Sequence, residues 1–136
     1  MEHLTNIEHL GIAVKSLEEG NALYTKILGT LPYKQEDVVA EGVRTSFFKV
    51  GSTKIELLEA AHAESPIAKF IEKRGEGLHH VAYAVDNIKA EMARLSQEGF
   101  RLLNEEPKEG ADNKWVCFLH PKDTGGTLIE LCQDRT

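Results

Sequence analysis

The chain has 136 residues, 41% of them hydrophobic and 28% charged, a composition typical of one globular domain or of two small halves with a shared core. The formal net charge of −6 argues against a nucleic-acid-binding protein, because such proteins present a basic face. Apolar runs are shorter than the roughly 18 residues of a membrane span, and the N-terminal MEHLTNIEHL lacks the pattern of a signal peptide. These features predict a cytoplasmic protein that binds no nucleic acid and no membrane. Cys117 and Cys132 lie inside apolar runs and are expected to be buried free thiols.

The first predicted element is a strand that ends at Val14. The segment SLEEGNALYTKILG then predicts a helix, since Ser16 and Glu19 have the spacing of a capping box and Gly29 is a typical helix stop. Two strands about a short turn at Gly51 are predicted in SFFKVGSTKIELLE, and the overlapping VRTSFFKV is expected to contribute a strand.

The middle segment, AHAESPIAKFIEKRGEG, predicts a connecting helix with Ser65 as its N-cap and Pro66 in its first position. A strand that ends at Val85 follows, and then a helix in DNIKAEMARLSQEG, with Asp86 as its expected N-cap and Gly99 as its end. The segment RLLNEEP is expected to contribute a strand, and VCFLHPKDTGGTLIELC predicts two more strands about a longer turn.

The two halves of the chain repeat one order of elements: strand, helix and three strands. HLGIAV and HVAYAV open the first strand of each half and align His9 with His80, and both halves close on I-E-L, which aligns Glu56 with Glu130. The repeat predicts an α+β fold of tandem βαβββ modules within a single domain, 1–136. We expect the first module at about 5–61, the connecting helix at about 64–75 and the second module at about 77–133.

The two aligned histidines stand beside small residues, because side chains alternate between the faces of a strand. The neighbours that share a face with His9 or His80 are Gly11, Ala13, Ala82 and Ala84. Such residues leave open space over both imidazole rings. His79 points to the opposite face and is expected to have a structural role.

The two aligned glutamates each lie between an isoleucine and a leucine. They share their faces with apolar residues, namely Leu58, Leu128 and Cys132. A single glutamate in such a strand can simply face water, but a carboxylate on an apolar face is costly unless it is paired or bound to a metal. Imidazole and carboxylate together suit divalent first-row ions. The sequence therefore predicts a metal site made of His9, Glu56, His80 and Glu130.

The repeated module and its ligand positions resemble the vicinal oxygen chelate superfamily, which includes glyoxalase I and extradiol dioxygenases. Within it, the chain is most similar to the methylmalonyl-CoA epimerase family, through the combination of GEGLHHVAYAV, EEPKEG and FLHPK. The resemblance implies a curled, cup-shaped mixed sheet and a homodimer. It also implies a metal held by His9, His80 and Glu130, with Glu56 at a position that is glutamine in some members.

The resemblance further implies the reaction, interconversion of (R)- and (S)-methylmalonyl-CoA in propionate metabolism, with an acyl-CoA as the bound small molecule. Proton abstraction at C2 would give a metal-stabilised enolate, with Glu130 as the expected catalytic base. Cobalt is the ion most associated with this activity, and Zn²⁺, Ni²⁺ and Mn²⁺ are the alternatives.

The chain departs from some members of the family at the second acid/base. Those members carry a glutamate shortly after a Gly-Val pair, whereas Thr45 stands there in this chain. Glu41, Glu56 and a metal-bound water remain as alternatives for that role. Cations for the CoA phosphates are available, although lysines of this kind are usually only a solvated surface: Lys69, Lys73, Lys114 and Lys122.

Two other functions fit part of the pattern. A glyoxalase I-like lactoylglutathione lyase would use the same four ligands, but the second turn reads HPKDTGG, where glyoxalases typically carry aspartate-proline-aspartate-glycine. A metal-free small-molecule-binding member of the superfamily is the other alternative, and the four intact ligand positions argue against it.

Overall fold

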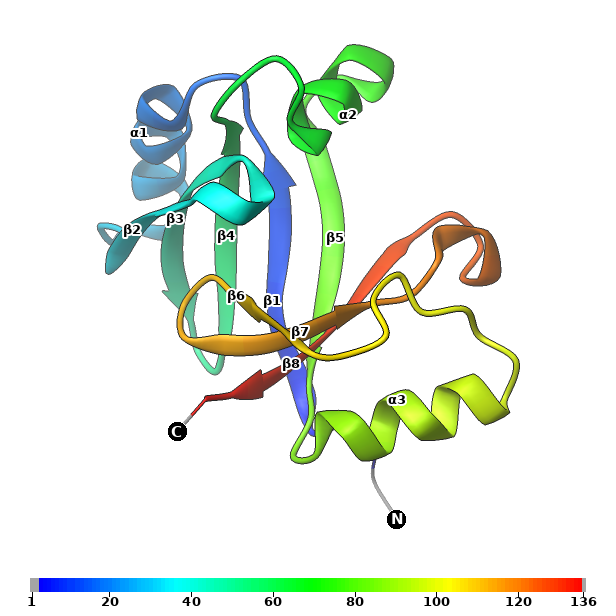
Figure 1. Cartoon of the computed structure of the whole chain (residues 1–136). Helices are drawn as coiled ribbons and strands as arrows, with labels where there is room; N and C mark the ends of the chain where they lie inside the picture. Colours follow the sequence, from blue (N-terminus) through cyan, green and yellow to red (C-terminus); the bar gives the residue numbers. More distant parts are fainter. Residues whose placement is uncertain (1–2, 136) are drawn as a thin grey trace. The chain divides into compact units, whose positions relative to one another are not determined.

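The structure is a computed structural model that describes residues 3–135 (Figure 1). It consists of two compact units, one formed by His9–His79 and the other by the residues up to Glu8 together with those from His80 onward. The strands and helices, in chain order, are β1 (Asn6–Ala13), α1 (Leu17–Leu28), β2 (Lys34–Val38), β3 (Val43–Val50), β4 (Thr53–Ala60), α2 (Pro66–Arg74), β5 (Gly77–Ala84), α3 (Ile88–Gln97), β6 (Lys108–Gly110), β7 (Lys114–Phe118) and β8 (Leu128–Asp134). Two 3₁₀ turns, Val39–Glu41 and Pro121–Asp123, lie between strands. Within the described residues, no helix combines the length and the apolar character that crossing a membrane requires.

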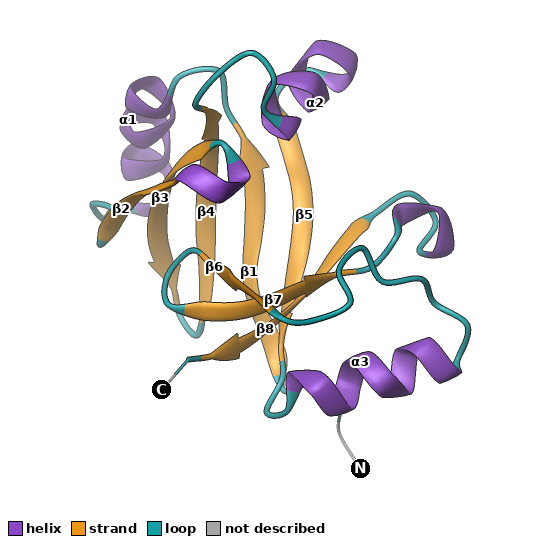
Figure 2. Ribbon diagram, viewed as in Figure 1, coloured by secondary structure: helices purple, strands orange, loops and turns teal. Residues whose placement is uncertain are grey.

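The first unit contains a sheet with the strand order β2-β3-β4-β1. The β1–β4 pair is parallel, and the other two pairs are antiparallel. Helix α1 packs against β3 and β4 on one face (Figure 2), where Phe48 and Leu57 are fully buried. On the other face, Ala13 and Leu58 pack against Ile67 of α2. Packing of opposite faces by two helices explains why nearly every residue in the middle of β3 and β4 is buried.

The second unit repeats this plan with the strand order β5-β8-β7-β6. The β5–β8 pair is again parallel, and the other pairs are again antiparallel. Helix α3 covers one face through Ile88 and Met92, which pack against Cys117 and Leu131. The predicted α+β fold, with its repeated order of strand, helix and three strands, is therefore confirmed. The grouping of both modules into a single domain, 1–136, stays a prediction.

The helix ends agree with the sequence at α1 and α2. The Ser16 hydroxyl accepts a hydrogen bond from the Glu19 N–H at 3.2 Å, and Gly29 takes the left-handed conformation with φ of 69°. The Ser65 hydroxyl caps α2, and Pro66 is its first residue. The backbone N–H of a first helical residue has no partner within the helix. Proline, which lacks this N–H, therefore loses no hydrogen bond at that position.

The predicted N-cap of α3 was wrong by one residue. Asn87, not Asp86, caps the helix, and its side-chain oxygen accepts from the Ala90 N–H at 3.1 Å. The start of the helix is set by Gln133 of β8, whose side-chain oxygen accepts from the Ile88 N–H at 2.7 Å. A tertiary contact thus decides between two adjacent residues that both have good capping side chains.

Two edge strands also differ from the expectation. The segment RLLNEEP forms no strand, and in it only Leu102 makes an isolated bridge, to Leu119. The edge strand of the second unit is instead the short β6, with sequence KEG. The edge strand of the first unit is β2, with sequence KQEDV, which the sequence did not predict. Both are polar edge strands without apolar alternation, which is why their sequences gave no strand signal.

The cap assignment gives a direct stability test. We expect Asn87→Ala to lower the free energy of unfolding by about 1 kcal/mol, because the Ala90 N–H loses its acceptor. Asp86→Ala is the matched control and should change it by less than about 0.5 kcal/mol, as is usual for an exposed residue without a special contact. Urea unfolding of both variants measures the difference. A larger loss from Asp86→Ala would restore the original assignment.

Candidate metal and active site

The first unit holds a buried histidine–glutamate pair. His9 of β1 and Glu56 of β4 share one face of the sheet, because Gly11 is the residue directly opposite Glu56. The His9 Nε2 atom lies 3.3 Å from Glu56 Oε1, and the two side chains are 7% and 6% exposed. Phe47, opposite Glu56 on β3, meets the His9 ring edge-on, with ring centroids 6.4 Å apart. Packing by Phe47 restricts the orientation of the imidazole.

The second unit reproduces this arrangement with different residues. His80 Nε2 of β5 lies 3.2 Å from Glu130 Oε1 of β8, and the side chains are 4% and 7% exposed. Ala82 is the residue opposite Glu130 on β5, so the histidine is again one position away on the same face. Phe118, opposite Glu130 on β7, meets the His80 ring edge-on at 6.2 Å. Each unit therefore presents one imidazole nitrogen and one carboxylate oxygen at nearly the same separation.

These pairs have the chemistry of a divalent metal site. Burial of a carboxylate is costly unless a cation or hydrogen-bond donors offset the lost hydration. In each pair the nitrogen and the oxygen converge within 3.3 Å, as donors to one ion do. Each pair, within its own unit, thus offers donors of the kind that a divalent first-row ion binds.

His79, in the first unit, belongs to neither histidine–glutamate pair. Its ring packs edge-on against Phe70 of α2, with ring centroids 4.9 Å apart. This contact is what a structural histidine would make, and it agrees with the role expected from strand alternation.

The structure describes the surroundings of Thr45, which stands where some relatives carry a second glutamate, and of Glu41. Thr45 is 1% exposed and lies on the face of the first unit that carries Glu56, two residues along β3 from Phe47. Its hydroxyl donates to the main-chain oxygen of Glu36 at 3.1 Å. Glu41 lies outside the sheet, in the 3₁₀ turn that precedes β3.

A further carboxylate on the same face was missed by the sequence reasoning. Glu36 is directly opposite Thr45 across the β2–β3 pair, so both side chains share the face that carries His9 and Glu56. Its carboxylate lies 3.4 Å from the Lys34 ammonium and is 31% exposed. Strand alternation could not place Glu36 on this face, because β2 itself could not be predicted from the sequence.

The four lysines considered for phosphate binding differ in environment. Lys69, Lys73 and Lys122 are exposed, as expected of surface lysines. Lys114 is 9% exposed and is paired with Asp134 and, at 3.7 Å, with Glu8. Burial lowers the pKa of Lys114, but its hydrogen bond to Asp134 and the charge of Glu8 outweigh burial and hold the pKa above its ordinary value. Lys114 therefore stays charged and already has two anionic partners.

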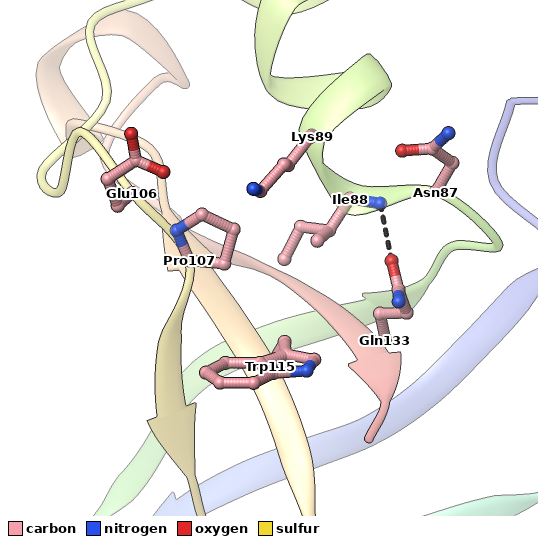
Figure 3. Close-up of a pocket in the computed structure, with 7 residues that line it drawn as sticks. All are labelled: Asn87, Ile88, Lys89, Glu106, Pro107, Trp115 and Gln133. Atoms are coloured by element: carbon pink, nitrogen blue, oxygen red, sulfur yellow. Dashed lines mark hydrogen bonds between the residues drawn. The ribbon is translucent and has the colours of Figure 1, made fainter. Parts of the chain in front are cut away.

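A pocket of about 350 Å³ in the second unit does not contain the histidine–glutamate pair. It lies between the start of α3 and strands β7 and β8, beside Trp115 and Gln133 (Figure 3). These two residues are opposite each other and point to the face covered by α3, whereas Glu130 points to the other face. The pocket and the pair thus lie on opposite sides of this sheet.

Comparison with known proteins defines the family. The model of the glyoxalase/bleomycin resistance protein/dioxygenase superfamily matches residues 8–118. The chain belongs to this superfamily. The match includes all of the paired site residues except Glu130.

Three known proteins are similar to this chain over nearly its whole length. The ethylmalonyl-CoA/methylmalonyl-CoA epimerase of Cereibacter sphaeroides is 44% identical, over 93% of this chain and 96% of its own. The mitochondrial methylmalonyl-CoA epimerase of Homo sapiens is 43% identical, over 96% of this chain and 75% of its own. A solved structure of Streptomyces coelicolor methylmalonyl-CoA epimerase with 2-nitronate-propionyl-CoA has a TM-score of 0.94 and 33% identity, over 98% of this chain and 99% of that one. The predicted resemblance to this enzyme family is confirmed.

Proposed function

We propose that the chain is a metal-dependent epimerase that interconverts (R)- and (S)-methylmalonyl-CoA by proton transfer at C2. The observation that carries the proposal is the buried histidine–glutamate pair in each unit, on a chain that is similar over nearly its whole length to methylmalonyl-CoA epimerases. An acyl-CoA substrate is supported by the complex of the Streptomyces coelicolor relative.

The proposed metal ligands are His9, Glu56, His80 and Glu130, with Co²⁺ as the ion and Zn²⁺, Ni²⁺ or Mn²⁺ as alternatives. A bound divalent cation would take up the thioester and carboxylate oxygens of the substrate and disperse the charge that develops as the C2 proton leaves. The protein supplies surroundings that are poor in water, because the four side chains are no more than 7% exposed.

Glu130 is the proposed base. Its carboxylate accepts the C2 proton. His80 lies beside this carboxylate, and Phe118 packs edge-on against the His80 ring. A second group must deliver a proton to the opposite face of C2. Thr45 is poorly suited, since its hydroxyl already donates to a main-chain oxygen and a hydroxyl is a weak acid. Glu36 therefore joins Glu41, Glu56 and a metal-bound water among the candidates.

The competing activity within the superfamily is that of a glyoxalase I-like lactoylglutathione lyase. The same four ligands would serve it, so the ligand set alone does not separate the two reactions. The test is to supply the purified protein with (R)-methylmalonyl-CoA, and separately with the glutathione hemithioacetal of methylglyoxal. We expect (S)-methylmalonyl-CoA to form and the hemithioacetal to remain. Turnover of the hemithioacetal alone would replace the proposal with the lyase.

We further propose that the protein is a homodimer and that it acts in the cytoplasm, in propionate metabolism. A dimer is supported by apolar side chains that α1 and the following loop leave in solvent: Leu23 is 54% exposed, Ile27 63% and Leu31 73%. Sedimentation equilibrium measures the mass directly, and Ile27→Glu should convert a dimer that uses this face to a monomer. A monomeric parent protein would exclude it.

A further inference from the structure

The two oxygens of the Glu130 carboxylate have different partners. Oε1 faces His80 Nε2 at 3.2 Å, whereas Oε2 accepts a hydrogen bond from the Cys132 thiol, with Sγ 2.8 Å away. Cys132 follows Glu130 by two residues in β8, so both side chains point to the same face. As whole residues, Cys132 is 1% exposed and Glu130 is 5% exposed. A buried thiol thus fixes the oxygen that does not face the histidine.

The first unit lacks this thiol contact, although its histidine–glutamate distance and its phenylalanine–histidine ring geometry match those of the second unit. The histidine–glutamate distances are 3.3 and 3.2 Å, and the phenylalanine–histidine ring planes meet at 87° and 86°. The residue two positions after Glu56 is Leu58, which packs with Ala13 and Ile67 and has no polar hydrogen to donate. The thiol is therefore a chemical difference between the two histidine–glutamate pairs.

We propose that Cys132 is a positioning residue that holds the Glu130 carboxylate in the orientation in which it works. The final torsion of a glutamate is broad, so a buried carboxylate without a fixed oxygen can rotate between several orientations. A donor on Oε2 selects one of them and leaves Oε1 directed at the His80 side. This inference rests on the proposed function, in which Glu130 is the base.

The chain offers well-matched variants. Cys132→Leu gives the second unit the residue that the first unit has, and it removes the donor. Cys132→Ser keeps a donor at the same position. Cys117 is a second buried thiol, on the α3-covered face of the neighbouring β7, with Sγ 3.8 Å from the main-chain oxygens of Asn104 and Phe118. Cys117→Leu therefore controls for the loss of a buried thiol that does not touch a carboxylate.

We expect Cys132→Leu to lower kcat by about 10-fold or more, the usual cost of losing a residue that orients a metal ligand or catalytic group, with KM changed by less than about 2-fold. Cys132→Ser should recover kcat to within about 3-fold of the parent. Cys117→Leu should affect thermal stability but leave the kcat of the folded protein unchanged. Cys132→Ala, which creates no extra bulk, replaces the leucine variant if that variant does not fold.

A second readout is independent of turnover. The affinity for Co²⁺, measured by competition with a chromogenic chelator, should fall by about 10-fold in Cys132→Leu. It should return to the parent value in Cys132→Ser. The visible absorption of the bound Co²⁺, which reports ligand geometry, should follow the same order. A folded Cys132→Leu or Cys132→Ala protein with unchanged kcat, affinity and spectrum overturns the inference, and so does an equal loss in the serine and leucine variants. If the parent protein fails to epimerise methylmalonyl-CoA, the proposed function fails, while the affinity and the spectrum still decide whether Cys132 positions Glu130.

Discussion

Glu130→Gln should lower kcat by at least about 10²-fold while most of the metal stays bound. Glutamine keeps the size of the side chain and one oxygen donor, but it cannot accept a proton at neutral pH. The measurements are kcat with methylmalonyl-CoA and the metal content of the same preparation. Glu56→Gln is the matched control in the other unit. It should be milder, because glutamine stands at that position in some members of the family.

Hydrogen exchange at C2 in D₂O separates the base from a simple ligand. An enzyme with two bases that loses one can still exchange deuterium into one epimer while it fails to invert it. Glu130→Gln should therefore stop exchange from one epimer more than from the other. Equal slowing of both, together with a one-sided pattern in Glu36→Gln or Glu41→Gln, would make Glu130 chiefly a ligand.

His80→Ala should weaken metal binding by more than about 100-fold, which is the upper end of the effect of losing a residue that only orients a ligand. The reason is the loss of an imidazole that is 4% exposed and 3.2 Å from the Glu130 carboxylate. Metal analysis after dialysis against a weak chelator measures the loss.

His79→Ala is the adjacent control for His80→Ala. It removes an edge-on contact with Phe70 and should cost about 0.5–1.5 kcal/mol of stability while the metal is retained. Equal loss of metal from both variants, or a greater loss from His79→Ala, would mean that the alignment of the two halves is wrong at its anchor.

The sequence was sufficient for the first and last strand of each repeat and for the residues of the histidine–glutamate pairs. Alignment of HLGIAV with HVAYAV and of the two I-E-L endings selected His9, His80, Glu56 and Glu130, and the structure pairs them two by two within its units. This worked because a strand converts spacing directly into a face. The same rule separated His79 from its neighbour His80.

The parts that could not be predicted depend on contacts distant in the sequence. Strands β2 and β6 are held by pairing with β3 and β7 rather than by an apolar pattern of their own, so their polar sequences read as loops. The start of α3 depends on Gln133, and the carboxylate of Glu36 reaches the site face only through the register of β2. Lys114 looked like a surface lysine until the structure placed it between Glu8 and Asp134.

The most direct test of a metal-dependent epimerase is the interconversion of (R)- and (S)-methylmalonyl-CoA by one preparation before chelation, after chelation and after addition of Co²⁺. The metal content of each sample is measured alongside. We predict that activity disappears with the metal and returns with Co²⁺, and that other divalent ions restore it less effectively. Full activity in a sample verified to be free of metal would contradict the proposed roles of both histidine–glutamate pairs.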